Sequence, residues 1–339
     1  MTRTGRVAAL LALALPAALT AAVSLGSVDI PVGEVWRVVG HRLAGDPPAP
    51  GTRDLIVWQL RVPRALLAAI VGAGLGLVGT AVQALVRNPL ADPYLLGISS
   101  GASLGAVAMI VLGAGVGSGV GFGVSTAAFA GALAAFALVW SVARRGGGFA
   151  PLRLVLAGVA IGQFLSGFTS FLVLRAGDDQ QTRGVLFWLM GSLGGAQWSQ
   201  LTVPAVVVAG GLVVLLARAR ALNALLMGDE TAAGLGVDVV RLRRELFAVT
   251  SLLTGVMVAV SGAIGFVGLL VPHVCRLLVG GDHRRLLPVS ALAGSVLLVV
   301  VDTVARTALD TQEVPIGVVT ALIGAPVLLF LLDRRLEPR

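Results

Sequence analysis

The sequence predicts an all-α protein that crosses a lipid bilayer about ten times, and two observations carry this prediction. Hydrophobic residues make up 57% of the 339-residue chain and charged residues only 12%, whereas about a quarter of the residues in a soluble domain are charged. Mostly apolar runs of about 20 residues, long enough for a membrane-spanning helix, recur between short arginine-bearing segments. We therefore expect residues 1–339 to form one transmembrane domain without a separate water-soluble domain.

The first apolar run, residues 7–25, follows Arg3 and Arg6 and resembles a secretory signal peptide. It is longer than a usual signal core, so we favour an uncleaved first span. The other nine spans are expected near residues 61–86, 94–113, 122–142, 152–174, 201–217, 246–264, 266–281, 288–304 and 315–332. The count can change by one, because the region 246–281 can be divided differently.

Three segments between these spans are too short or too polar to cross. Residues 31–43 have an apolar face at helical spacing, which predicts a short helix at the membrane interface. Residues 187–198 carry two tryptophans and are expected at the interface as well. Residues 175–183 are expected to form a polar loop.

The stretch Leu60–Gly105 organises the chain as two spans joined by a polar elbow at residues 87–93. Small residues allow helices to approach closely in lipid, where apolar side chains gain little from association. The residues expected to serve this purpose are Gly72, Gly74, Gly76, Gly79, Gly97, Gly101 and Gly105.

Several functions are excluded by what the sequence lacks. All 25 basic residues are arginine, so the chain has neither the lysine of a nucleotide-binding phosphate loop nor a Schiff-base lysine. The pattern GxGxxG at residues 74–79 lies inside an apolar span without a preceding strand, so it does not indicate a nucleotide site. One cysteine, Cys275, and three isolated histidines predict no metal site and no cofactor.

The arginines also predict the orientation of the chain. The predicted spans place 16 of them on the side of both termini and 8 on the other side, with Arg276 inside a span. Cytoplasmic segments are enriched in positive charge, so we expect cytoplasmic termini and a cell-membrane location. The arginines lie in short segments between apolar runs, and this distribution argues against a nucleic-acid partner.

Arg61 and Arg64 lie three residues apart at the outer end of the second span, hence on one helix face. They are interpreted either as interfacial arginines in contact with lipid or as contacts for an acidic protein partner. Arg306, on another outer loop, would give such a partner a third contact. Asp302 is expected near Arg306, and Glu313 is expected to pair with Arg306 or to cap the last helix.

Residues 218–245 form the largest polar insertion. A short helix is expected over residues 222–228, and a second should begin at Asp229 and Glu230, because acidic residues favour a helix N-terminus. Gly234 and Gly236 would end it. The alternatives are an ordinary cytoplasmic loop and a rigid lever for a separate motor subunit.

Two rival functions remain. An ion-coupled secondary transporter would normally carry ionisable residues at mid-membrane, and we place none there in the second to seventh spans. A membrane scaffold without transport activity would make no use of the polar insertion.

Seven blocks of sequence in register resemble the FecCD-type permease family of binding-protein-dependent ABC importers for ferric siderophores, haem and cobalamin. The blocks are RVPR (61–64), GTAVQALVRNPLADPYLLGISSGASLG (79–105), LVLAGVAIG (154–162), FWLMGSLGG (187–195), DETAAGLGV (229–237), GFVGLLVPHVCRLLVGGDHRRLLP (265–288) and EVPIGVVTALIGAPVLLFLL (313–332). The resemblance implies a type II ABC importer permease of ten helices that pairs with a second permease subunit around a central path. It also implies a solute-binding protein outside, two cytoplasmic ATPase subunits, and no catalytic site in this chain.

The resemblance assigns roles to particular residues. It makes Arg61, Arg64 and Arg306 the contacts for the binding protein. It also implies that one segment couples the permease to the ATPase, and this segment includes Leu222, Leu225, Met227, Asp229, Glu230, Ala233 and Gly236. A gate is expected at Phe149, Pro151 and Leu152, and a pore face at Gln163, Ser166, Thr169 and Ser170. Ferric siderophore is the expected substrate on family frequency alone, with cobalamin and haem as alternatives.

Overall fold

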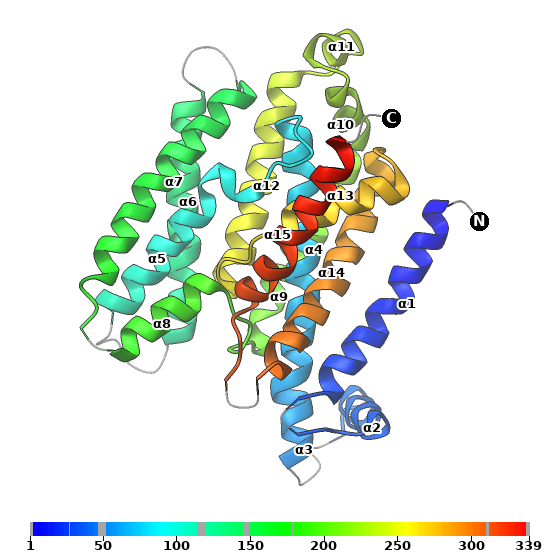
Figure 1. The fold of residues 1–339 in the computed structure, drawn as a ribbon, viewed down its shortest axis with the longest axis vertical. Coiled ribbons are helices and arrows are strands. Elements are labelled where there is room, and N and C mark those ends of the chain that lie inside the picture. The colour runs from blue at the N-terminus through cyan, green and yellow to red at the C-terminus, as the bar shows by residue number, and fades with distance from the viewer. Residues whose placement is uncertain are drawn as a thin grey trace.

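The computed structural model describes residues 3–26, 28–46, 52–113, 120–144, 149–177, 179–309 and 312–336, and these ranges contain helices and loops but no strand. Figure 1 shows the helices gathered in one bundle. In chain order the helices of the first half are α1 (Arg3–Ser24), α2 (Val32–Leu43), α3 (Thr52–Leu55), α4 (Val62–Leu85), α5 (Ile98–Leu112), α6 (Val120–Ala143), α7 (Pro151–Val173) and α8 (Asp179–Met190). Those of the second half are α9 (Thr202–Ala217), α10 (Ala219–Leu226), α11 (Asp229–Gly234), α12 (Val239–Ser261), α13 (Val267–Val279), α14 (His283–Thr307) and α15 (Ile316–Leu336).

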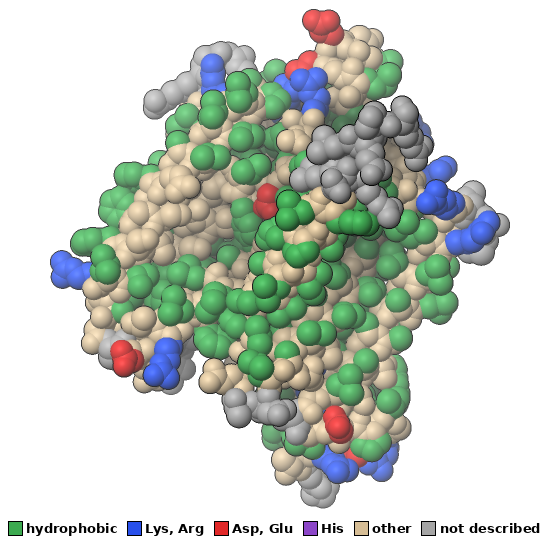
Figure 2. All heavy atoms as spheres, viewed as in Figure 1, with side chains coloured by type: hydrophobic (Ala, Val, Ile, Leu, Met, Phe, Trp, Pro, Cys, Tyr) green, Lys and Arg blue, Asp and Glu red, His purple; other side chains and the backbone are tan. Residues whose placement is uncertain are grey.

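Each of the ten expected spans corresponds to an apolar helix, but three of these helices are shorter than a full span. Within the described residues, seven helical segments are long and apolar enough to cross a membrane, and α5, α13 and α15 are shorter apolar helices. Hydrophobic side chains cover most of the middle of the bundle in the view of Figure 2, while charged side chains gather mainly toward its margins. The helix expected over 31–43 is confirmed as α2.

Helix α4 is the centre of the bundle. It continues from α3 through the π-helical residues Ile56–Arg61, and most of its length is buried. It packs against α12, α13 and α14, while α5, α6 and α7 form a group on one side and α1 lies on the other, next to α14. Both termini, α10 and α11 lie at one end, here called the terminal end, and α2 and α3 lie at the opposite end (Figure 1).

The starts of two helices, α12 and α8, differ most from the sequence prediction. Helix α12 begins at Val239 rather than near residue 246, because the Asp238 carboxylate caps it by accepting the Arg241 backbone N–H at 2.9 Å. A pair between Arg241 and Glu245 (3.0 Å), one turn apart, further stabilises this polar first part. Helix α8 begins at Asp179, inside the predicted polar loop, where an acidic residue in the first turn favours the helix.

Glycines allow the central helices to touch through their backbones, as the sequence predicted. A Cβ atom added to Gly79 would lie 1.8 Å from the carbonyl oxygen of Gly268, and one added to Gly72 would lie 2.1 Å from that of Gly294. Contacts this short cannot exist, so any side chain at these positions must push α4 away from α13 or α14.

Gly79→Ala is therefore expected to destabilise the fold by about 1–3 kcal/mol, the usual cost of an overpacked interior. Gly210→Ala is the matched control, since a Cβ atom there has nothing within 4 Å. Thermal unfolding of both variants in detergent checks the prediction. Equal melting temperatures for the two variants would contradict the close backbone packing.

Candidate functional site

Three groups of residues in this bundle have features of functional sites, and the first is an arginine cluster at the opposite end. Arg61, Arg64 and Arg306 all line one polar cavity of about 390 Å³. The structure therefore brings together the three arginines that were predicted as docking contacts, although α4 and α14 are far apart in sequence.

Each of these arginines is already bonded within the chain. Arg61 donates to the backbone carbonyls of Val23 (2.8 Å) and Val28 (2.6 Å), which closes the turn after α1. Arg306 donates to the carbonyl of Ala22. Such bonds hold the end of α1 against α4 and α14.

Arg64 is the centre of the cluster. Its guanidinium lies 2.9 Å from a carboxylate oxygen of Asp302 and 2.9 Å from one of Glu313. Asp302 also lies 3.5 Å from Arg306, which confirms their expected proximity. Glu313 pairs with Arg64 rather than with Arg306, and this differs from the sequence prediction. The Glu313 side chain is 46% exposed, so the side of Arg64 that faces Glu313 is open to a competing anion.

The second group is a hydroxyl-lined cavity of about 330 Å³ between α5 and α7. Ser166, Thr169 and Ser170, predicted as part of a pore face, all line it. The lining also includes Tyr94 and three serines of α5 that the sequence argument missed, namely Ser99, Ser100 and Ser103. The run SSGAS in the sequence, at helical spacing opposite apolar residues, was the available indication. Gln163 is exposed on α7 outside this lining.

The predicted gate residues separate in the structure. Phe149 is buried at 2% exposure. Its ring centroid lies 4.8 Å from that of Trp140 and 6.3 Å from that of Phe247. Pro151 begins α7, and Leu152 is 71% exposed beside it. Phe149 thus anchors the start of α7 to α6 and α12, and Leu152 is the member of this set that faces outward.

The third group is the helix pair α10–α11, which protrudes at the terminal end in Figure 1. The expected short helix, turn and second helix are confirmed, and Gly236 follows α11 with a positive φ of 82°. Asp229 accepts a bond from Arg243 (2.7 Å) and lies 3.6 Å from Arg87, so it ties α11 to α12 and to the elbow after α4.

A polar clamp fixes α10 to the start of α14. The Asn223 amide donates to Asp282 at 2.7 Å, and its carbonyl oxygen accepts the backbone N–H of His283 at 2.9 Å. The Asn223 amide and the backbone N–H of Arg284 hold the pKa of Asp282 below its usual value. This clamp was missed in the sequence, where His283 stood as an isolated histidine.

The two faces of the helix pair differ. Leu222 and Leu225 are buried, so they hold α10 on the bundle and do not face outward. Leu226, Met227 and Leu235 are 41%, 68% and 65% exposed. Glu230, Ala233 and Gly236 are also exposed. We call this exposed set the outer surface of the helix pair. Leu226 and Leu235 were not predicted, because the sequence of an amphipathic helix does not show which of its faces packs against the rest of the protein.

Among the described residues, ten apolar helices, a hydroxyl-lined cavity and a protruding helix pair are the architecture expected of a multi-pass membrane permease. The chain belongs to the FecCD transport family, which it matches over residues 12–334. The family is one of transport permeases rather than enzymes, and the resemblance seen in the sequence is confirmed.

Individual relatives support the same class. The chain is 46% identical over 338 residues to the cobalamin import system permease protein BtuC of Halobacterium salinarum, covering 98% of this chain and 89% of that one. It is 44% identical over 285 residues to the hemin transport system permease protein HmuU of Yersinia pestis, covering 84% and 85%.

A solved structure is similar over nearly the whole chain. It is described as an inward-facing conformation of a metal-chelate type ABC transporter, with a TM-score of 0.85, 31% identity, and coverage of 97% of this chain and 99% of that one. The protein is therefore an ABC importer permease.

Proposed function

We propose that this permease imports a metal chelate through the cytoplasmic membrane by ATP-driven alternating access, with both termini in the cytoplasm. The observation that carries the proposal is the outer surface of the helix pair, an apolar protrusion at the terminal end of a chain that has no lysine for nucleotide binding. The excess of arginines on that side supports its cytoplasmic orientation.

The proposed assembly contains two copies of a permease, identical or different, two ATPase subunits and a solute-binding protein. The ATPase subunits would grip the helix pairs, and the binding protein would dock over the arginine cluster at the opposite end. ATP binding can move the permease only if the motor binds one permease conformation better than the other. The polar clamp and the Asp229 pairs make the helix pair stiff enough to transmit that movement.

The substrate we propose first is a ferric siderophore, as the family resemblance favoured. Cobalamin and haem are the second candidates, because the two relatives above are named for cobalamin and hemin. A hydroxyl-lined cavity without charged side chains in its lining supports passage of a bulky polar chelate with little binding on the way.

Uptake into proteoliposomes tests the function. The permease reconstituted with its ATPase and loaded binding protein is expected to accumulate chelate only with ATP, and vanadate should stop uptake. In a second experiment the permease is reconstituted alone and an ion gradient is applied. Uptake under these conditions would indicate a secondary transporter and would contradict the proposal. Titration of the binding protein with ferric siderophore, cobalamin and haem separates the substrates.

Glu313→Gln tests docking at the arginine cluster. Since Glu313 occupies the exposed side of Arg64, its removal frees that side for a carboxylate of the binding protein. We expect roughly three- to tenfold tighter docking at low salt and a steeper loss of affinity as salt increases, measured by surface plasmon resonance.

Glu34→Gln is the matched control, because Glu34 pairs with Arg37 and Arg53 on α2 and α3 at the same end of the bundle and does not line the cavity. The same affinity change in both variants, or none in either, would remove the docking role of Arg64.

A further inference from the structure

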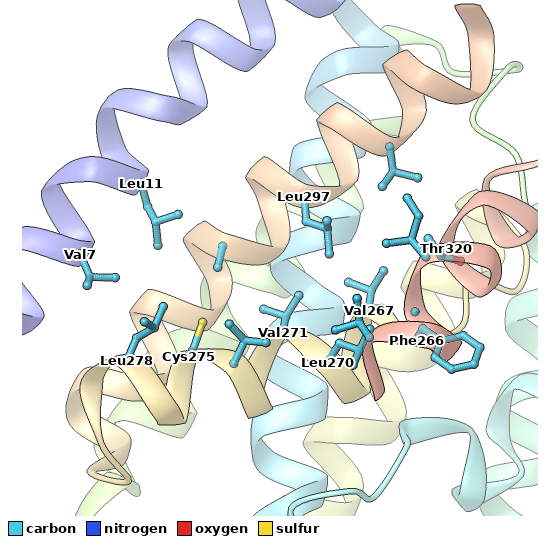
Figure 3. A pocket seen from close by; sticks show the side chains of 16 residues that line it. Val7, Leu11, Phe266, Val267, Leu270, Val271, Cys275, Leu278, Leu297 and Thr320 are labelled. Atoms are coloured by element: carbon cyan, nitrogen blue, oxygen red, sulfur yellow. The ribbon is translucent and has the colours of Figure 1, made fainter. Parts of the chain in front are cut away.

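An apolar crevice of about 330 Å³ lies between α1 and α15, over the surface of α13 and α14 (Figure 3). Val7 and Leu11 of α1 lie at one side of it, and Phe266 and Thr320 lie at the other. Leu270 and Val271 of α13 form part of its floor. No charged side chain lines it among the described residues, so the crevice suits a hydrocarbon occupant.

The length of the crevice along α13 is comparable to the thickness of one leaflet of a bilayer. It follows α13 from Leu278, near the terminal end, to Phe266 just before the helix. Twelve helical residues span about 18 Å, which is somewhat more than half of the roughly 30 Å hydrocarbon core. An acyl chain that enters from the terminal end would therefore lie along the whole crevice.

Basic residues begin two of the helices that line the crevice, α1 and α14. Arg3, Val7 and Leu11 follow each other at four-residue spacing, so Arg3 extends the stripe of α1 that lines the crevice by one turn. Arg284 and Arg285 are exposed in the first turn of α14. Basic side chains gather beside the N-terminus in Figure 2. Clusters of this kind attract anionic lipid headgroups.

We propose that the crevice binds an anionic glycerophospholipid of the surrounding membrane. One acyl chain fills the space between α1 and α15, and the phosphate lies at Arg3, Arg6, Arg284 and Arg285. Helix α1 has few buried residues of its own, so this lipid adds to the packing of its first half, while the Arg61 and Arg306 bonds hold its other end. The inference depends on the membrane location of the chain and not on its transport substrate.

Native mass spectrometry of the full chain tests the proposal. The delipidated protein is offered equal amounts of phosphatidylglycerol and phosphatidylcholine with identical acyl chains. We expect retention of one phosphatidylglycerol with about a tenfold preference, which corresponds to about 1.4 kcal/mol. Equal retention of the two lipids would overturn the headgroup assignment.

Variants locate the lipid. Leu11→Trp fills the crevice and is expected to abolish retention, whereas Leu10→Trp, at a side chain 66% exposed outside the lining, should retain the lipid. Ala293→Phe fills it from the α14 wall, in case the first variant folds poorly. Retention by both filling variants would overturn the site.

Charge variants separate the headgroup from the acyl chain. Arg284→Gln with Arg285→Gln should lower the preference for phosphatidylglycerol toward unity. Arg175→Gln just after α7, combined with Arg183→Gln in α8, should leave it unchanged. A concentration-dependent dimer that excludes lipid and is lost in Leu11→Trp would show that a second copy occupies the crevice, and this too would overturn the proposal.

Discussion

Replacing Met227 and Leu235 together by Asp is expected to abolish ATP-driven uptake, with at least a hundredfold loss of affinity for the ATPase subunits. Both side chains are about two-thirds exposed on the outer surface of the helix pair. Burial of each large apolar side chain contributes about 1.5–3 kcal/mol, and each 1.4 kcal/mol is tenfold in affinity. Copurification with the ATPase and uptake in proteoliposomes are the measurements.

Val240→Asp is the control for this pair of substitutions. Val240 is an exposed apolar residue of the same end, 38% exposed, but it belongs to the first turn of α12 rather than to the helix pair. A carboxylate there is compatible with the helix N-terminus, so assembly should persist. If the double variant copurifies with the ATPase as well as the parent does, the coupling role of the outer surface is refuted.

Asp229 is less suitable for the same test, because its carboxylate is bonded to Arg243, which is 5% exposed. A charge reversal at Asp229 leaves that arginine buried without its partner and loosens α11 from α12. Loss of uptake would then report misfolding of the helix pair as much as loss of the motor. Glu230, exposed on the same helix, allows a cleaner charge reversal.

The spans could be predicted from the sequence because each one is a long apolar run, and composition alone excludes other environments for such runs. The start of α12 could not, because its first turns are polar and become helical only through the Asp238 cap and the Arg241–Glu245 pair. An N-cap of this kind contributes about 1 kcal/mol, which is enough to turn a polar segment from loop to helix but is not visible in the apolar pattern.

Long-range pairing was the other limit. The sequence placed Arg64 and Glu313 at the same end of the protein, yet these residues are 249 positions apart, and no local pattern specifies their contact. Glu313 was instead expected to pair with Arg306, its neighbour in sequence, or to cap the last helix. Likewise, the period of α10 shows an apolar face, but only the packed structure shows that Leu222 and Leu225 face inward while Met227 faces outward.

Asp302→Ala is expected to destabilise the permease by about 3–5 kcal/mol, the usual cost of removing one partner from a buried ion pair. The Asp302 carboxylate is 2% exposed and is the group shared by Arg64 and Arg306, so its loss leaves two arginines close together with one acidic partner, Glu313. Unfolding by denaturant in detergent measures the effect. A variant as stable as the parent would show that the cluster does not hold α4 to α14.

The double variant Arg64→Met with Asp302→Leu separates stability from docking. Replacing both members of a buried pair by apolar residues of similar size is often neutral, but Arg306 also loses its carboxylate partner here. We therefore expect part of the stability lost in Asp302→Ala to return. Binding-protein affinity should nevertheless fall at least tenfold, because the guanidinium of Arg64 is no longer present for the incoming carboxylate. If docking survives in this folded variant, Arg64 has a structural role alone, and the binding protein must be held by Arg61, by Arg306 or by groups outside the cavity.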